Sequence, residues 1–238
     1  MERFPEMSFS AIRAVTFDVG GTLIEPWPSV GQVYAEIAMR FGTTGIAPEA
    51  LNRQFAVAWQ ARRRFDYSRS SWRELVNQTF AGVGAEPPGL ACFDAIYQHF
   101  ATPFPWRLFE DVLPALAALK ARGFKLGVVS NWDERLRPLL QELQLDVHFD
   151  ALVISHETSC AKPAPEIFRR AARALNIPPQ SILHIGDSPT EDVAGAKAAG
   201  MNAVLLDRKA ARSTFAVAHD LRSLAALLDK PIASARSD

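Results

Sequence analysis

The sequence of 238 residues contains few cysteines, no excess of charge and no long apolar run. Its two cysteines, Cys92 and Cys160, are too few for a disulfide framework and lack the spacing of a zinc site, so a reducing, cytoplasmic compartment is expected. Because 26 basic residues balance 26 acidic ones, the charge gives no reason to expect nucleic acid as a partner. No segment resembles a signal peptide or is apolar enough to cross a bilayer, so we expect no membrane partner.

The composition is that of a globular protein able to bury a core, since 48% of the residues are hydrophobic and 22% are charged. Short apolar runs rich in Val, Ile or Leu predict five buried strands, over residues 14–17, 125–129, 151–154, 182–185 and 203–206. Between most of them, apolar residues recur at helical spacing, over residues 115–122, 136–143, 167–175 and 192–199. This alternation predicts an α/β fold with a Rossmann-like, doubly wound parallel sheet and helices on both of its faces.

The segment 26–105 breaks this alternation, because it contains no convincing pattern of a strand. Instead, four groups of apolar and aromatic residues recur at helical spacing and are separated by turn segments. We therefore expect residues 26–105 to form a four-helix insertion directly after the first strand. Residues 11–25 and 106–228 are expected to form the α/β core, and residues 229–238 a flexible tail.

Polar side chains follow four of the predicted strands. They are Asp18, Ser130, Asn131, Lys162, Asp187 and Asp192. The carboxyl ends of parallel strands lie on one edge of the sheet, where ligands usually bind, so we expect these side chains to converge. Asp18 and Asp187 repel each other unless a cation lies between them, and hard oxygen ligands without histidine or thiolate favour magnesium. Lys162 and the Ser130 hydroxyl suit a phosphoryl group beside that metal, which a facing carboxylate can attack to give an aspartyl-phosphate.

Four short motifs occur in order along the chain: DVGGTL around Asp18, VVSN around Ser130, KPAPEIF from Lys162, and GDSPTED around Asp187. With these motifs the sequence resembles the haloacid dehalogenase (HAD) superfamily of hydrolases. The resemblance covers residues 11–24 and 106–228, and the helical insertion is similar to the C1 cap of that superfamily. The patterns DVxxTL and SNWDERL resemble in particular the branch named haloacid dehalogenase-like hydrolase domain-containing protein three.

The resemblance implies a magnesium-dependent phosphatase that acts on a small phosphorylated metabolite through an aspartyl-phosphate at Asp18. The catalytic residues that it implies are Asp18, Ser130 and Lys162. The implied substrate-binding residues are Thr22, Ser130, Asn131 and Lys162. The implied metal ligands are Asp18, the carbonyl of Gly20, Asp187 and Asp192, the last of which would support either the metal or Lys162 from close by.

Gly20 departs from the pattern of the superfamily's phosphatases, which carry an aspartate at this position, two residues after the nucleophile. That aspartate protonates the leaving oxygen, and general acid–base help of this kind is worth roughly 10²–10⁴-fold in rate. Three explanations stay open: a substrate with a good leaving group, another acid such as Glu25 or a cap residue, or loss of efficient phosphatase activity. We therefore expect weak or specialised activity, and the alternative is a near-inactive or non-enzymatic module that binds a ligand or a protein.

Two other chemistries of the superfamily are disfavoured by what the sequence contains. The halide-cleaving members need no magnesium and lack the acidic fourth motif, whereas GDSPTED is intact here. The phosphonate-cleaving members use a lysine of the cap, and the segment 26–105 contains no lysine.

Two further features are open to a structural or a functional interpretation. Arg62, Arg63 and Arg64 in the insertion form either a solvated helix face or a group from which one arginine reaches an anionic substrate. His184 lies in an apolar strand and is expected to be a buried structural residue, not a ligand. Neither the identity of the substrate nor the oligomeric state follows from the sequence.

Overall fold

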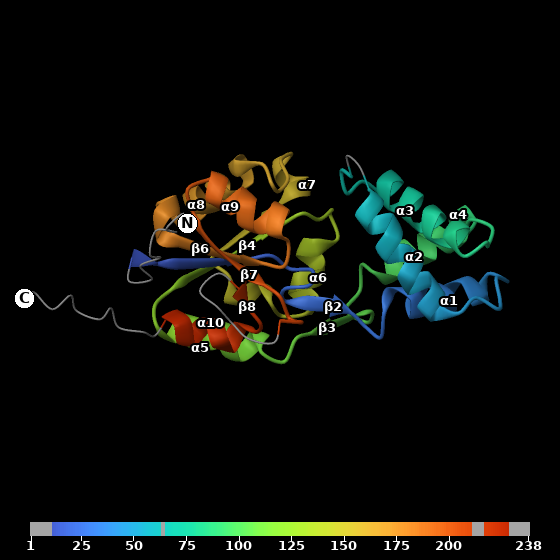
Figure 1. Ribbon diagram of the computed structural model, residues 1–238, viewed down its shortest axis with the longest axis horizontal. Helices are drawn as coiled ribbons and strands as arrows, with labels where there is room; N and C mark the ends of the chain where they lie inside the picture. Colours follow the sequence, from blue (N-terminus) through green and yellow to red (C-terminus); the bar gives the residue numbers. More distant parts are fainter. Residues whose placement is uncertain (1–10, 63–64, 211–216, 229–238) are drawn as a thin grey trace, which may run out of the picture. The chain divides into compact units, whose positions relative to one another are not determined.

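The computed structural model describes residues 11–62, 65–210 and 217–228 of the chain (Figure 1). The chain forms two compact units, and each is described by itself. The first, here called the α/β unit, comprises the described residues 11–24, 108–131, 145–210 and 217–228. The second, here called the helical unit, comprises the described residues 25–62, 65–107 and 132–144. The predicted tail and two residues of the arginine cluster, Arg63 and Arg64, lie outside the described residues.

The α/β unit contains a six-stranded parallel sheet with the strand order β5-β4-β1-β6-β7-β8. Its strands are β1 (Ala14–Phe17), β4 (Lys125–Ser130), β5 (Ala151–Ile154), β6 (Ile182–Gly186), β7 (Asn202–Leu206) and β8 (Val217–Ala218). The five predicted strands and the parallel sheet are therefore confirmed. Strand β8 was not predicted, because two residues carry no periodic pattern.

Helices cover both faces of this sheet, with α8 and α9 on one face and α5 and α10 on the other (Figure 1). The helices of the unit are α5 (Val112–Ala121), α7 (Ser155–Thr158), α8 (Pro165–Leu175), α9 (Gly195–Ala198) and α10 (Leu221–Leu228), with short 3-10 turns at η2 (Asp146–His148) and η3 (Pro179–Ser181). Helix α8 begins at a proline, which suits a first helical turn, and buries one apolar face against the sheet. This arrangement confirms the doubly wound, Rossmann-like core.

The predicted helix over residues 192–199 is present, but its first part is not α-helical. The chain instead forms a π-helical turn, η4 (Pro189–Ala194), and only then enters α9. Side chains compete here for backbone donors: Ser188 Oγ accepts from the Glu191 N–H at 3.1 Å, and Asp192 Oδ2 accepts from the Ser188 N–H at 3.0 Å. Single π-helical turns are rare and occur frequently at functional sites, which directs attention to Asp192.

The helical unit contains the four helices that the sequence predicts in the insertion. They are α1 (Val30–Arg40), α2 (Pro48–Ala61), α3 (Arg69–Gly82) and α4 (Leu90–His99). Ser29 and Ser68 begin α1 and α3 as N-caps, since each hydroxyl accepts from a backbone N–H of the first turn. The apolar faces of the four helices meet in one buried cluster that includes Tyr34, Phe80 and Phe93.

Two features of the helical unit were not predicted. Strands β2 (Ile24–Pro26) and β3 (Trp106–Leu108) pair where the insertion begins and ends in the sequence, and three residues are too few to show a strand pattern. Helix α6 (Leu136–Glu142) groups with this unit, although the predicted core had included it. The Arg135 side chain explains this grouping, because it donates to the Tyr97 carbonyl at 3.0 Å and its guanidinium lies 3.6 Å from the Tyr97 ring centroid. None of the described helices is long and apolar enough to cross a membrane.

Candidate functional site

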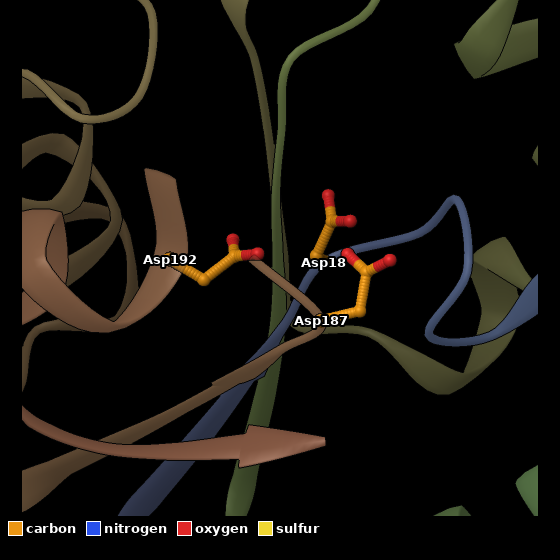
Figure 2. A group of neighbouring side chains, drawn as sticks. All are labelled: Asp18, Asp187 and Asp192. Carbon is orange, nitrogen blue, oxygen red and sulfur yellow. The ribbon is translucent and has the colours of Figure 1, made fainter. Parts of the chain in front are cut away.

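Three aspartates converge at the carboxyl edge of the parallel sheet (Figure 2). Asp18 follows β1, Asp187 follows β6, and Asp192 lies in the π-helical turn η4. One carboxylate oxygen of each lies within 4.8 Å of one oxygen of the other two. The strands β1 and β6 are parallel neighbours in the sheet, so their ends bring Asp18 and Asp187 side by side. The convergence that the sequence predicts for these three residues is thus present in the structure.

Lys162 lies between two of these aspartates, and its side chain is almost fully buried. Its Nζ donates to Asp18 Oδ1 at 2.7 Å and to Asp192 Oδ1 at 2.6 Å. Burial by itself would lower the pKa of Lys162, but the charges of the two carboxylates outweigh this effect and hold the pKa above its ordinary value. Lys162 is therefore an ammonium at any physiological pH, available to an anion that approaches Asp18.

Asp18 is held by hydrogen-bond partners from three parts of the α/β unit. Its Oδ1 accepts from Ser130 Oγ at 3.0 Å as well as from Lys162, and its backbone N–H donates to the Ile185 carbonyl at 2.9 Å. Burial raises the pKa of Asp18, and the nearby charge of Lys162 opposes that shift. These contacts fix the carboxylate in one orientation beside a permanent positive charge, which is the arrangement that a carboxylate nucleophile requires.

Asn131 has its side-chain amide engaged by the neighbouring backbone. Its Oδ1 accepts from the Lys162 N–H at 2.7 Å, and its Nδ2 donates to the Lys162 carbonyl at 2.9 Å. Nδ2 also lies 3.3 Å from Glu191 Oε2. The sequence predicts Asn131 as a substrate-binding residue, and the structure places its amide where it clamps the segment that carries Lys162.

The loop after Asp18 approaches Asp187 so closely that only glycine fits. Gly21 has a φ angle of +77°, and a Cβ atom built there would lie 2.4 Å from Asp187 Oδ2. The loop is closed by the Gly21 N–H, which donates to the Ile24 carbonyl at 2.8 Å. Gly20, the residue whose carbonyl the resemblance assigns to a metal, is half-buried and pairs with Ile24 through an isolated β-bridge.

Thr22 is predicted to bind substrate, but its side chain is fully buried, and its Oγ1 has no hydrogen-bond partner among the described residues. Its carbonyl accepts from Arg208 Nη2 at 2.7 Å. Arg208 in turn donates through Nη1 to Asp111 Oδ2 at 3.0 Å, and its guanidinium lies 3.6 Å from the Phe109 ring centroid. Arg208 and Asp111 therefore hold the loop that carries Gly20 and Gly21. No motif marks these two residues, and the only signal in the sequence is the place of Arg208 shortly after a strand.

The pKa values of Asp187 and Asp192 are shifted in opposite directions. Desolvation of the carboxyl group, followed by the negative charges of Asp18 and Asp192, raises the pKa of Asp187 to about 7. Burial would also raise the pKa of Asp192, but the charge of Lys162 and the hydrogen bond from His184 lower it below its ordinary value. The Lys162 charge also lowers the pKa of Asp187 but does not offset these effects, whereas Asp192 forms a direct ion pair with Lys162.

The carboxylate oxygens of these aspartates are suitable ligands for a hard divalent cation. Asp18 and Asp187 offer oxygens that come close together, and a cation between them would relieve the repulsion that raises the pKa of Asp187. Asp192 is less available, since Lys162 and His184 hold Oδ1 and the Ser188 N–H holds Oδ2. Its contacts favour the second of its two predicted roles, the support of Lys162.

Two candidates for an additional functional group lie in the helical unit. The Glu25 carboxylate is paired with the Arg107 guanidinium, whose Nε lies 3.1 Å from Glu25 Oε1, so its Oε1 is engaged by this neighbour. The Arg62 guanidinium lies 3.6 Å from the Trp59 ring centroid and donates to the Trp59 carbonyl at the end of α2. Arg62 therefore packs on its own helix.

The fold and this site define a Rossmann-like α/β protein with an acidic centre at the carboxyl edge of its sheet. The family model of haloacid dehalogenase-like hydrolases matches residues 12–200. The chain belongs to this family of hydrolases.

Relatives support this assignment over most of the chain. Haloacid dehalogenase-like hydrolase domain-containing protein 3 of Mus musculus is 34% identical over 233 residues, which cover 91% of this chain and 92% of the relative. Glyceraldehyde 3-phosphate phosphatase of Methanopyrus kandleri is 34% identical over 135 residues, which cover 53% of this chain and 55% of that protein. The first relative is of the branch that the opening motif and SNWDERL indicate.

Solved structures show the same fold. The crystal structure of a HAD phosphatase from Thermococcus onnurineus matches with a TM-score of 0.65 and 25% identity, over 92% of this chain and 98% of that one. The structure of L-2-haloacid dehalogenase from Xanthobacter autotrophicus matches with a TM-score of 0.71 and 21% identity, over 91% of this chain and 98% of that one. At this identity the second likeness concerns the fold alone.

Proposed function

We propose that this hydrolase is a magnesium-dependent phosphatase that acts on a small phosphorylated metabolite through an aspartyl-phosphate at Asp18. The observation that carries the proposal is the position of the Lys162 ammonium, 2.7 Å from Asp18 Oδ1 at the carboxyl edge of the sheet. This pair offers a nucleophile and a charge that can hold a phosphoryl oxygen in the same place. The GDSPTED motif and the phosphatase among the relatives support the same chemistry.

Magnesium would be held by the carboxylates of Asp18 and Asp187 and by the carbonyl of Gly20. When bound, it would neutralise the charge of the two carboxylates and polarise the phosphoryl group. The raised pKa of Asp187 and the close approach of Gly21 to its carboxylate support this choice of residues. We assign Asp192 the role of holding the Lys162 ammonium, whose Nζ lies 2.6 Å from Asp192 Oδ1, and not that of a metal ligand.

In the first step, an oxygen of Asp18 attacks phosphorus, the bond from phosphorus to the leaving oxygen breaks, and that oxygen departs with the bonding electrons. Lys162 and the Ser130 hydroxyl bind the oxygens of the phosphoryl group as it is transferred. In the second step, water attacks the phosphorus of the aspartyl-phosphate, which releases inorganic phosphate and restores the Asp18 carboxylate. Because Lys162 remains protonated, it supplies charge and not a proton to these steps.

The absence of an acid at position 20 points to the class of substrate. A leaving oxygen that receives no proton must be stable as an anion, so an acyl or aryl phosphate should react far better than an alkyl phosphate. The missing general acid corresponds to roughly 10²–10⁴ in rate, or about 3–5 kcal/mol. Glu25, a candidate replacement, is paired with Arg107, which favours a good leaving group over a substitute acid. We assign the helical unit the role of a cap that selects among such substrates.

A panel of phosphate esters, assayed with and without magnesium, tests this function. Turnover should require the metal, should favour aryl and acyl phosphates, and should disappear in Asp18→Asn. A matched control is Asp146→Asn, which removes a carboxylate in η2, ahead of β5 and away from the carboxyl edge of the sheet. Metal-independent turnover, or equal activity of Asp18→Asn and the control, would contradict the proposal.

The second candidate is a ligand-binding module without significant turnover, and Gly20 is the observation that favours it. In that case the site would bind a phosphorylated ligand and magnesium without releasing phosphate. Calorimetric titration of the wild type with slowly hydrolysed phosphate esters separates the two functions, because tight binding without turnover of any ester in the panel favours the module.

A further inference from the structure

His184 is fully buried beneath the site, in the middle of β6. Its neighbour across the sheet is Thr16 of β1, which is also fully buried. The other residues of these two strands are glycine or apolar, so this pair places polar atoms in an otherwise apolar layer. Burying polar groups is costly unless each finds a partner, which makes the partners of His184 informative.

Both ring nitrogens of His184 have partners. Nδ1 lies 3.0 Å from Thr16 Oγ1, and Nε2 lies 3.0 Å from Asp192 Oδ1. An ionised carboxylate only accepts hydrogen bonds, so Nε2 must carry a proton, and the Thr16 hydroxyl, which can donate or accept, is the partner of Nδ1. The ring of Phe168 lies edge-on at 5.0 Å between centroids and packs beside the imidazole.

Three other features bring Asp192 to this position. The π-helical turn carries it toward β6, and the Ser188 N–H holds its Oδ2 at 3.0 Å. Gly186 leaves room for it, because a Cβ atom there would lie 2.2 Å from Asp192 Cγ. The same Asp192 Oδ1 that receives His184 Nε2 also receives Lys162 Nζ. A chain of hydrogen bonds therefore runs from Thr16 through His184 and Asp192 to Lys162.

We infer that His184 is a positioning residue for the proposed phosphatase: its Nε2–H, fixed by Thr16, orients Asp192, and Asp192 holds the Lys162 ammonium against Asp18. The inference rests on the proposed function in one respect, the role of Lys162 in binding the phosphoryl group of the substrate. It extends the expectation that His184 is a buried structural residue and not a ligand, since the residue is fully buried. A purely structural Thr16–His184 pair would tolerate apolar residues of similar size at both positions, because replacing both partners of a buried hydrogen bond is nearly neutral.

The first experiment observes the resting protein and needs no turnover. Long-range ¹H–¹⁵N correlation spectra at neutral pH assign the tautomer of His184, and we expect the proton on Nε2. A bare Nε2 would overturn the inference, because two acceptors would then face each other. Spectra of the lysine side chains give a second readout: the buried Lys162 ammonium should give a slowly exchanging signal that is lost in His184→Leu and restored in His184→Gln.

The second experiment measures steady-state kinetics with an aryl phosphate and magnesium. His184→Leu should lower kcat by about 10–100-fold, the range usual for removing a hydrogen-bond partner that orients a residue of a metal site. His184→Gln should recover most of the lost activity, because its side-chain amide can donate to Asp192. Thr16→Val and Thr16→Ser are a matched pair, of which only the serine variant keeps the hydroxyl on Nδ1 and should keep the activity.

The outcomes separate this inference from the proposed function. If no variant, including the wild type, turns over any ester, the proposed function fails, and the tautomer and the ammonium signal still judge the role of His184. If His184→Leu folds, keeps the Lys162 signal and keeps its kcat, the positioning role is wrong whatever the substrate.

Discussion

Replacing Gly21 with alanine should damage the metal site more than the fold. Alanine at a φ angle of +77° costs roughly 1–2 kcal/mol in backbone strain. For a chain of this size, that lowers Tm by roughly 2–8 °C. The added Cβ would also lie 2.4 Å from Asp187 Oδ2, and the flexible carboxylate can relieve this contact only by moving about 1 Å away. Magnesium demands near-ideal octahedral geometry, so a displaced ligand should weaken its binding by roughly 10–100-fold.

Gly123→Ala is the matched control for this prediction. Gly123 has a φ angle of +81°, but no atom lies within 4 Å of its added Cβ, so the variant carries the same strain without the contact. With magnesium at 100 times its dissociation constant, the wild type and the control should gain about 2.7 kcal/mol of stability, whereas a hundredfold weaker site gains about 0.4 kcal/mol. Thermal unfolding with and without magnesium measures the difference. Equal stabilisation of all three proteins would refute the reasoning.

Four further predictions concern other parts of the site. Gly20→Asp should raise kcat for alkyl phosphates more than for aryl phosphates, and equal effects on both would reject the missing acid as the cause. Arg208→Met should lower kcat and reduce the free energy of unfolding by about 1–2 kcal/mol, because the Thr22 carbonyl loses its charged donor. Steady-state kinetics and chemical denaturation measure the two effects, and an unchanged kcat would show that Arg208 does not support the loop. Since the pKa of Asp187 is about 7 without metal, magnesium affinity should fall by up to about tenfold for each pH unit below 7. The raised pKa of Asp187 also contributes to the stability of the metal-free folded protein. This contribution is fully present below the ordinary pKa of 3.8 and is lost as the pH rises toward 7, so Asp187→Asn should abolish this pH-dependent loss of stability. Calorimetry and thermal unfolding across pH 5–8 check both signs, and a flat profile would count against them.

The sequence predicts the sheet and the convergence of the site well, because both depend on local patterns and on parallel strands. The runs that become β1 and β6 are apolar, and the aspartates that follow them must meet at one edge. The roles of Asp192 and His184 depend on contacts that no spacing reveals. A helix pattern over 192–199 does not distinguish an α-helical start from the π-helical turn that turns Asp192 toward Lys162.

Other differences have the same physical origin in contacts between distant residues. Helix α6 has an ordinary apolar stripe, and its association with the helical unit depends on Arg135 and the Tyr97 ring. Asn131 and Thr22 have the residue types of ligand-binding groups, yet the backbone of Lys162 and the guanidinium of Arg208 decide where they are held. Single-residue chemistry predicts which side chains belong near the site, and tertiary packing decides which of them face a ligand.

The shared ammonium of Lys162 has a consequence for the order in which ligands bind. One positive charge faces Asp18, Asp192 and, once it is ionised, Asp187, so the centre is negative overall before a cation arrives. A phosphorylated substrate would be repelled from such a centre. The cation should therefore enter first and the substrate second, and competitive inhibition by free phosphate should be strong only when magnesium is present.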